Sequence, residues 1–202
     1  KIAAEKLSIR DMDHYRQTVS NALTMQGENL LRAKQLIENF KKTAVDQHHL
    51  EIESINIKDY YNKVVSTLNS ILKTKKATLT ITGDDDINLA TYPGVHAQII
   101  TNLITNSMRH GFSNNKNNRI TFTIIQQGPL VEVHYQDNGV GLSDEAKKYV
   151  FEPFFTTARK SGGVGLGMSI VYNLITQKLK GKIFIDKNSS GACFIYQFKA
   201  TP

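Results

Sequence analysis

The sequence is poor in cysteine, because Cys193 is the one cysteine among its 202 residues. A disulfide framework needs at least two cysteines, so this chain cannot build one within itself, and a reducing compartment such as the cytoplasm is expected. Cys193 lies in the apolar run ACFIYQF. That setting predicts a core residue.

Long apolar runs are also missing. No stretch of about 18 apolar residues could cross a bilayer, and the opening KIAAEKLSIRDMDHYRQ is neither a signal peptide nor a transit peptide. With 40% hydrophobic and 21% charged residues, the composition is that of an ordinary soluble domain. We expect this part of the protein to be cytoplasmic and to make no direct membrane contact. Because it does not begin with Met, we expect it to be a piece of a longer protein, which leaves a membrane anchor elsewhere open.

Acidic residues are in the minority, and the formal net charge is +7. The lysines are nevertheless scattered through FKK, KTKK, AKK and KLKGK, and they do not form one stripe with aromatic residues. This distribution argues against nucleic acid as a ligand. An anionic small molecule or an acidic protein surface would use the same charge.

One long helix is predicted near the N-terminus. Ser8 and Asp11 fit a capping box, and no proline interrupts the residues that follow, up to residue 47. A helix of nearly forty residues is about 55 Å long at 1.5 Å per residue, which exceeds a small domain. Its narrow apolar seam therefore predicts a helical hairpin or a dimeric bundle, with packing against its own chain as the alternative. Apart from a break at Gln26, the seam follows alternating steps of four and three through Val19, Leu23, Leu30, Ala33, Ile37, Phe40 and Ala44.

From about residue 49 the pattern changes to mixed helices and strands. Alternating stretches predict strands, and helically spaced apolar residues predict helices. Proline at the start and glycine at the end bound one of these helices. The expected order is strand 50–57, helix 58–75, strand 77–84, helix 93–111, hairpin 119–139, helix 168–179 and strands 181–188 and 191–200. This order predicts an α+β sandwich in which a mixed, mainly antiparallel sheet carries helices on one face.

Two asparagines share a face of the helix expected at 93–111. Asn102 and Asn106 are four residues apart, and Arg109 and His110 continue that face one turn later. Asparagine is a mediocre helix former, so two on one face predict a polar contact. An amide oxygen suits Mg²⁺, which takes one or two protein ligands beside substrate phosphates. For the helix alone, a solvated polar face is an equally good interpretation.

A strand is expected to end at Asp137, with Gly139 and Gly141 directly after it. Glycines at these positions permit positive φ and a close approach of the backbone to a ligand. A carboxylate held at a strand end can accept a hydrogen bond from an exocyclic amine such as that of adenine. By itself the pattern is a weak signal, because turns rich in Asp and Gly are common.

Three glycines, Gly163, Gly165 and Gly167, precede another predicted helix. Glycines there present backbone N–H groups and the positive end of the helix dipole to phosphate oxygens. No Walker loop is present, and Met168 leaves the dinucleotide pattern incomplete. The His-Arg-Asp and Asp-Phe-Gly motifs of ordinary protein kinases are missing as well.

These motifs follow one order along the chain: Asn102 to Asn106, Asp137-x-Gly139-x-Gly141, Phe151-x-Pro153-Phe154 and Gly163-x-Gly165-x-Gly167. Together they resemble the N, G1, F and G2 boxes of the ATP-binding domain of sensor histidine kinases, in the GHKL superfamily with the Bergerat fold. The resemblance covers about residues 49–202. The stretch QLIENFKKTAVDQ is similar to the second helix of the family's dimerisation and histidine-phosphotransfer hairpin, so we expect domains at 1–47 and 48–202.

The resemblance implies ATP and Mg²⁺ as ligands and gives individual residues roles. Asp137 is expected to take the adenine amino group, with Gly139 and Gly141 letting the base approach, and Asn106 matches the family's Mg²⁺ ligand. A mobile lid over the phosphates is expected from the third and fourth motifs. The remaining expected nucleotide contacts are Asn102, Arg109, His110, Phe154, Thr156, Thr157, Gly163, Gly165, Leu166 and Gly167.

One position separates kinases from hydrolases in this superfamily. Members that hydrolyse ATP, like the anti-sigma-factor serine kinases, resemble one another in carrying glutamate four residues before the metal-binding asparagine, where it acts as a general base. This chain has Asn102 there. Asparagine in place of glutamate favours transfer of the phosphate to a histidine, which is already nucleophilic. A hydrolase, a serine kinase and a non-catalytic ATP-binding module are the alternatives.

The family's phosphoacceptor pattern, a histidine followed by an acidic residue and soon after by a proline, is missing. We therefore expect no catalytic acceptor in this chain, which would bind ATP and form a homodimer through its N-terminal helix without phosphorylating itself. In the complete protein the resemblance implies a response-regulator receiver domain as partner. The histidines that lack the acceptor context are His14, His48, His49, His96, His110 and His134.

Overall fold

The computed structural model describes residues 12–27, 29–30, 51–112, 117–157, 163–186 and 189–200. The chain divides into two compact units, Lys1–Ala44 and Val45–Pro202. Among the described residues, no helix combines the length and the apolar character that a membrane span needs.

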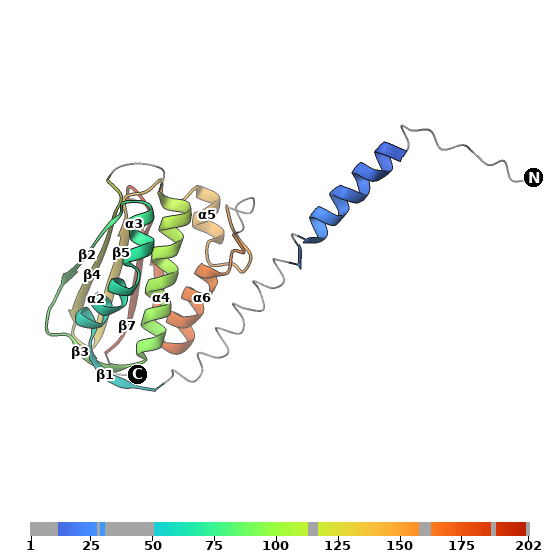
Figure 1. Ribbon diagram of the computed structural model, residues 1–202. Coiled ribbons are helices and arrows are strands. Elements are labelled where there is room, and N and C mark those ends of the chain that lie inside the picture. Colours follow the sequence, from blue (N-terminus) through green and yellow to red (C-terminus); the bar gives the residue numbers. More distant parts are fainter. Residues whose placement is uncertain are drawn as a thin grey trace, which may run out of the picture. The chain divides into compact units, whose positions relative to one another are not determined.

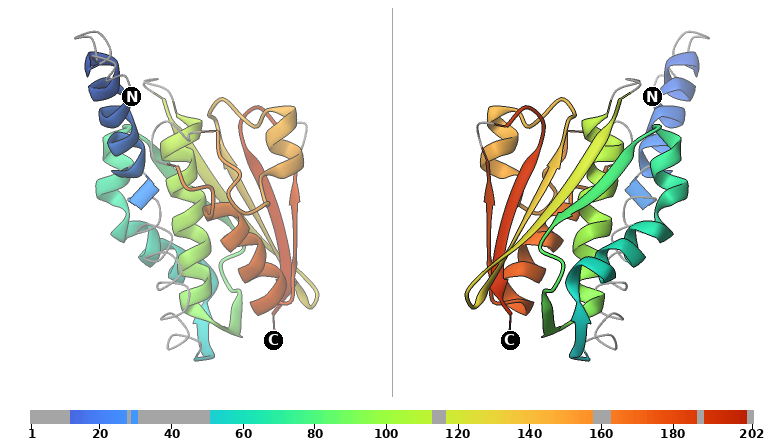
Figure 2. Two further views of the ribbon diagram at one scale, coloured as in Figure 1. Left: turned by 90° about the vertical axis from the view of Figure 1, so that its right-hand side faces the viewer. Right: turned by 90° about the vertical axis from the view of Figure 1, so that its left-hand side faces the viewer.

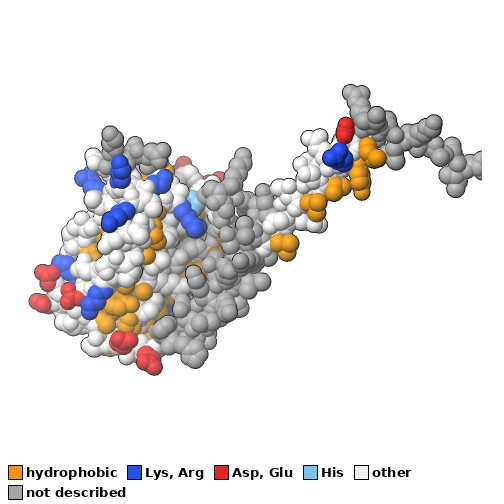
Figure 3. Space-filling view, in the orientation of Figure 1, with side chains coloured by type: hydrophobic (Ala, Val, Ile, Leu, Met, Phe, Trp, Pro, Cys, Tyr) orange, Lys and Arg blue, Asp and Glu red, His pale blue; other side chains and the backbone are white. Residues whose placement is uncertain are grey.

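In the first unit, residues 12–27 and 29–30 are helical and all their side chains are exposed. Three residues of the predicted seam belong to this helix: Val19, Leu23 and Leu30 are exposed at 38%, 62% and 71%. Figure 3 shows apolar side chains along one side of it. The other seam positions and the two capping residues lie outside the described residues, namely Ala33, Ile37, Phe40, Ala44, Ser8 and Asp11.

The second unit contains an open sheet of five strands in the order β2-β4-β5-β7-β6. β2 runs parallel to β4, and the other neighbours are antiparallel. A separate antiparallel pair joins β1 to β3. The helices lie on one face of the sheet (Figures 1 and 2), which confirms the α+β sandwich. The strands are β1 Glu53–Asn56, β2 Thr78–Gly83, β3 Asn88–Thr91, β4 Arg119–Gln127, β5 Leu130–Asp137, β6 Lys182–Ile185 and β7 Cys193–Lys199.

The observed elements differ from the predicted ones in three respects. The helix expected at 58–75 is divided at Leu68, and the short elements α5 and β3 were not predicted. π-helical segments continue α4 and α6, at Ser107–Gly111 and Leu174–Lys178. The α-helices of the second unit are α2 Ile57–Thr67, α3 Asn69–Thr74, α4 Pro93–Asn106, α5 Asp144–Tyr149 and α6 Gly167–Asn173.

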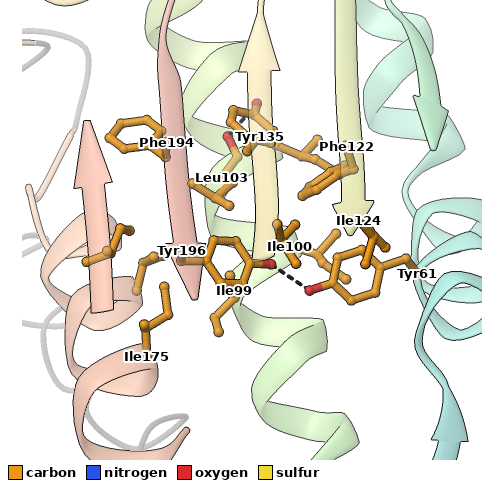
Figure 4. Packing of buried hydrophobic residues seen from close by; sticks show 14 of the residues in the cluster. Tyr61, Ile99, Ile100, Leu103, Phe122, Ile124, Tyr135, Ile175, Phe194 and Tyr196 are labelled. Carbon is orange, nitrogen blue, oxygen red and sulfur yellow. Dashed lines mark hydrogen bonds between the residues drawn. The ribbon is translucent and has the colours of Figure 1, made fainter. Parts of the chain in front are cut away.

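The core lies between the helices and one face of the sheet. Every second residue of the central strands is buried there, while the residues between them are mostly polar and only half-buried. Such alternation is typical of a sheet with one solvated face. Cys193 is buried, as predicted. The buried strand residues are Ile120, Phe122, Ile124, Val131, Val133, Tyr135, Phe194, Tyr196 and Phe198, and α4 adds Ile99, Ile100, Leu103 and Ile104. Figure 4 labels eight of them, Ile99, Ile100, Leu103, Phe122, Ile124, Tyr135, Phe194 and Tyr196.

A polar network is enclosed in this core near the start of α4. The hydroxyls of Tyr61 and Tyr196 are 2.5 Å apart (Figure 4). The ring of His96 lies 3.2 Å from Tyr61 OH through Nδ1 and 3.0 Å from Thr91 Oγ1 through Nε2. Complete burial lowers the pKa of His96 to about 3, because the charged ring would lose its hydration. The network therefore holds a neutral histidine with both nitrogens paired.

Candidate nucleotide site

The C-terminal half of α4 meets the start of α6. Asn102 and Asn106 are half-buried, and Gly167, the first residue of α6, lies against both amides. A Cβ built on Gly167 would be 3.4 Å from Asn106 Oδ1 and 3.6 Å from Asn102 Oδ1. The structure thus brings the predicted N and G2 motifs together, with two amide oxygens beside the first turn of a helix.

Asp137 ends β5 and is almost completely buried. Its Oδ1 accepts hydrogen bonds from the backbone N–H groups of Gly139 (2.9 Å) and Ala192 (3.0 Å). Its Oδ2 accepts one from the hydroxyl of Ser107. These bonds hold the carboxylate in one orientation at the end of the sheet.

Gly139 and Gly111 pack backbone against backbone beside this carboxylate. A Cβ on Gly139 would be 2.4 Å from Gly111 O, and a Cβ on Gly111 would be 3.1 Å from Asp137 Oδ2. Gly111 O also accepts a 3.0 Å hydrogen bond from Val140 N–H. Of the two glycines after Asp137, it is Gly141 that has positive φ, at 75°. Position 139 requires glycine because its backbone packs closely against the backbone of Gly111, and not because of its φ.

The third and fourth motifs are joined by their backbones. Phe154, which is exposed and has φ of 68°, donates its N–H to Gly165 O at 2.9 Å. Gly165 has φ of 75°, and a Cβ there would be 2.5 Å from Phe155 O. Thr157 Oγ1 lies 3.3 Å from His110 Nδ1, so the segment after Phe154 reaches the π-helical segment that follows α4. Residues 158–162, which connect the two motifs of the expected lid, lie outside the described residues.

The other predicted residues surround this region less closely. The pKa of His110 is lowered, first by burial and then by the charge of Arg109, which is itself exposed. Leu166 precedes α6, and its carbonyl accepts from Ser169 Oγ at 2.9 Å. Thr156 and Gly163 are half-buried.

Two parts of the site were not predicted. Ser107 and Gly111, both in the π-helical segment, contact Asp137, and so does the backbone of Ala192 before β7. A π-helical segment after α4 has no simple periodic signal, although such segments are frequent at functional sites. Within the part of the chain that the structure describes, no cluster of three His, Cys, Asp or Glu could hold a metal ion.

Residues 94–202 match the family described as histidine kinase-, DNA gyrase B- and HSP90-like ATPase. The autoinducer 2 sensor kinase/phosphatase LuxQ of Vibrio vulnificus (strain YJ016) is 26% identical over 190 residues, which is 89% of this chain and 22% of that protein. The sensor histidine kinase ZraS of Escherichia coli O157:H7 is 24% identical over 165 residues, which is 79% of this chain and 33% of that protein. This chain therefore spans between a fifth and a third of these relatives.

Solved structures share the fold. A nucleotide-free catalytic domain of histidine kinase ThkA has a TM-score of 0.66 and 24% identity, covering 76% of this chain and 98% of that one. Full-length ShkA in complex with AMPPNP has a TM-score of 0.68 and 20% identity, covering 98% of this chain and 40% of that one. ThkA in complex with the response regulator TrrA has a TM-score of 0.66 and 22% identity, with 98% and 54% covered. The chain belongs to the histidine kinase-, DNA gyrase B- and HSP90-like ATPase family, and its second unit is an ATP-binding catalytic domain of the sensor histidine kinase type.

Proposed function

We propose that this domain binds ATP with Mg²⁺ and transfers the γ-phosphate to a histidine on a helical hairpin, from which it passes to an aspartate of a response-regulator receiver domain. The observation that carries the proposal is the buried carboxylate of Asp137, which is fixed at a strand end and has acceptor capacity left for a ligand. The family membership and the names of the relatives support it. We further propose that residues 1–47 form the hairpin part and 48–202 the catalytic domain.

The adenine end of the site fits the donor pattern of that base. A carboxylate offers about four lone-pair positions, and the three hydrogen bonds from Gly139, Ala192 and Ser107 leave one on Oδ2. Because position 111 is glycine, no side-chain atom of that residue stands beside Oδ2. Asp137 would accept the adenine amino group there, and Gly141, with its positive φ, would let the base lie close to the backbone.

The phosphate end fits a magnesium nucleotide. Amide oxygens are hard ligands that Mg²⁺ accepts, and the two at Asn102 and Asn106 lie beside Gly167. When bound, Mg²⁺ would neutralise charge on the phosphate oxygens. Asn106 would hold the ion, Asn102 would orient a phosphate, and the N–H groups at the start of α6 would donate to phosphate oxygens. Arg109 and His110 are near enough along the chain to add positive charge and a donor. We propose that Phe154, Thr156, Thr157, Gly163, Gly165 and Leu166 cover the phosphates.

Hydrolysis of ATP is a weaker interpretation. A hydrolase needs a base for water, and the amide of Asn102 cannot accept a proton at neutral pH. The same exchange argues against transfer to serine, whose hydroxyl also needs a base. A histidine side chain is nucleophilic when neutral, so orientation and charge neutralisation suffice for it.

We propose that the chain does not phosphorylate its own histidines. His96 is buried with both ring nitrogens paired, and His134 is bonded to Glu132 on the solvated face of the sheet. His110 belongs to the nucleotide site. His14 is exposed on the N-terminal helix but is followed by Tyr15, so the acceptor pattern is not met there either.

The N-terminal helix supports the protein partners that we propose. The exposed apolar residues Val19, Leu23 and Leu30 support self-association of the N-terminal helix as a homodimer. A receiver domain would dock on the resulting bundle. A species that stays monomeric at high micromolar concentration in analytical ultracentrifugation would count against the dimer.

The experiment follows the fate of γ-labelled ATP with Mg²⁺. We expect the label to stay in bound ATP, with no steady release of phosphate and no phosphohistidine by mass spectrometry. Release that continues in the wild type and stops in Asn106→Ala would identify a hydrolase and overturn the kinase proposal. Phosphohistidine on the chain would overturn only the statement that it lacks an acceptor.

A further inference from the structure

A chain of hydrogen bonds behind Asp137 belongs to none of the four motifs. Tyr135 OH and Ser107 Oγ are 2.5 Å apart, and Ser107 Oγ donates to Asp137 Oδ2. A hydroxyl has one proton to give, so Ser107 must accept from Tyr135 while it donates to the carboxylate. The carbonyl of Leu103, 3.1 Å from Tyr135 OH, is the other acceptor in reach of that phenol. The three side chains are buried, with exposures of 0% for Tyr135, 2% for Asp137 and 4% for Ser107.

The chemistry of the three side chains fixes which group donates each hydrogen bond in this series. Burial and the charge of Asp137 raise the pKa of Tyr135 well above its ordinary value, so the phenol keeps its proton. Asp137 Oδ1 accepts from two backbone N–H groups, one from Gly139, two residues further along the chain, and one from Ala192, directly before β7. Ser107 then takes one lone pair of Oδ2, and the last lone pair of that atom is left beside Gly111.

We propose that Ser107, held by Tyr135, is a positioning residue that sets the nucleobase selectivity of the site. With three of its lone pairs occupied, the carboxylate of Asp137 cannot rotate, and its remaining lone pair points at one place. A base with an amino group there donates a hydrogen bond to the remaining lone pair. A base with hydrogen or a carbonyl oxygen at that position leaves a buried acceptor unpaired. Sites that demand a hydrogen bond reject analogues lacking the donor far better than apolar pockets do. This inference rests on the proposed function, since it takes adenine to lie at Asp137.

The test compares two ligands, Mg-ATP and Mg-purine riboside triphosphate, which lacks only the 6-amino group. The dissociation constants of both are measured by calorimetry for the wild type, Ser107→Ala and Tyr135→Phe. We expect the wild type to prefer ATP, and Ser107→Ala to lose about tenfold of that preference while its affinity for the analogue is unchanged. Tyr135→Phe should lose less, in the same direction, and Ser107→Thr should restore the preference because it keeps the hydroxyl.

A double variant tests whether the two residues act as one unit. If Tyr135 works through Ser107, the variant carrying both Ser107→Ala and Tyr135→Phe should lose no more preference than Ser107→Ala alone. Tyr196→Phe is the matched control, because it deletes another buried phenol hydroxyl, in the network of Tyr61 and His96. It should lower the melting temperature without changing the preference for ATP.

The outcomes separate this inference from the proposed function. A Ser107→Ala variant that keeps the wild-type preference, or that weakens both ligands equally, would overturn the positioning role and leave ATP binding intact. If Ser107→Ala does not fold, Tyr135→Phe carries the same comparison. A wild type that binds neither ligand, or both equally, would overturn the adenine assignment of Asp137 and this inference with it.

Discussion

Two networks built on buried tyrosines lie toward opposite ends of α4. One joins Tyr61 and Tyr196 to His96, in the first turns of the helix. The other joins Tyr135 to Ser107, directly after the helix, and ends at Asp137. From position 96 to 107 the distance along the helix axis is about 16 Å at 1.5 Å per residue.

The two networks differ in whether a hydrogen-bond acceptor is left unpaired within the protein. At the start of α4, both nitrogens of His96 are paired inside the protein, and its ring stays neutral. At the end of α4, the network finishes in a carboxylate with a lone pair that no described residue takes. Burying polar groups is tolerable when each is paired. We infer that the first network stabilises the fold and that the second one receives a ligand.

Replacing Gly139 with alanine should break the second network most severely. The new Cβ would be 2.4 Å from Gly111 O, a backbone atom that also accepts the hydrogen bond of Val140 N–H. We expect no measurable ATP binding and a fall in melting temperature of about 2–10 °C. Gly128→Asn is the control, because position 128 has open space and φ of 60°, which asparagine tolerates. ATP affinity that survives Gly139→Ala would remove the need for this close approach.

Removing the amide of Asn106 should weaken the Mg²⁺-dependent part of ATP binding and leave the contacts of the base unchanged. We expect Asn106→Ala to lose at least about tenfold in affinity for ATP when Mg²⁺ is present, and to bind ATP like the wild type in EDTA. Asn173→Ala, an exposed asparagine of α6, is the matched control. Equal losses with and without Mg²⁺ would mean that Asn106 contacts the nucleotide and not the metal.

The first network should make stability depend on pH. The pKa of His96 is about 3 in the folded protein and 6.5 in the unfolded chain, so on acidification the unfolded chain takes the proton first. Its contribution is complete above pH 6.5 and is lost as the pH falls toward 3. Between pH 6.5 and 5 this amounts to about 2 kcal/mol in the free energy of unfolding.

Urea unfolding of the wild type and His96→Gln over that pH range measures the contribution. Because other groups titrate equally in both proteins, the difference between the two curves isolates His96. We expect the variant to have the flatter pH profile and unchanged ATP affinity. Parallel profiles would mean that His96 takes up a proton in the folded protein as readily as in the unfolded chain.

Sequence patterns predicted the features that lie within a single helix or strand. Alternation predicted β4, β5 and β7, since their burial alternates along each strand, and the spacing of Asn102 and Asn106 placed both on one face of α4. β3 and α5 were missed because four and six residues carry little periodicity. The division at Leu68 was missed because no glycine or proline marks it.

The partners of Asp137 could not be predicted in the same way. Its bond with Ser107 joins residues 30 apart in sequence, and its bond with Ala192 joins residues 55 apart. A serine after a helix and an alanine before a strand carry no signal by themselves. Only the folded arrangement of α4, β5 and β7 gives them a role.

The most direct measurement is the affinity of Mg-ATP for the wild type and for Asp137→Asn, by calorimetry, with melting temperatures recorded for both. Asp144→Asn, at an exposed carboxylate, serves as control. We expect Asp137→Asn to lose at least about a hundredfold in affinity, while its melting temperature stays within a few degrees of the wild type. An Asp137→Asn variant that folds and binds Mg-ATP as tightly as the wild type would mean that Asp137 is not the acceptor of the adenine amino group.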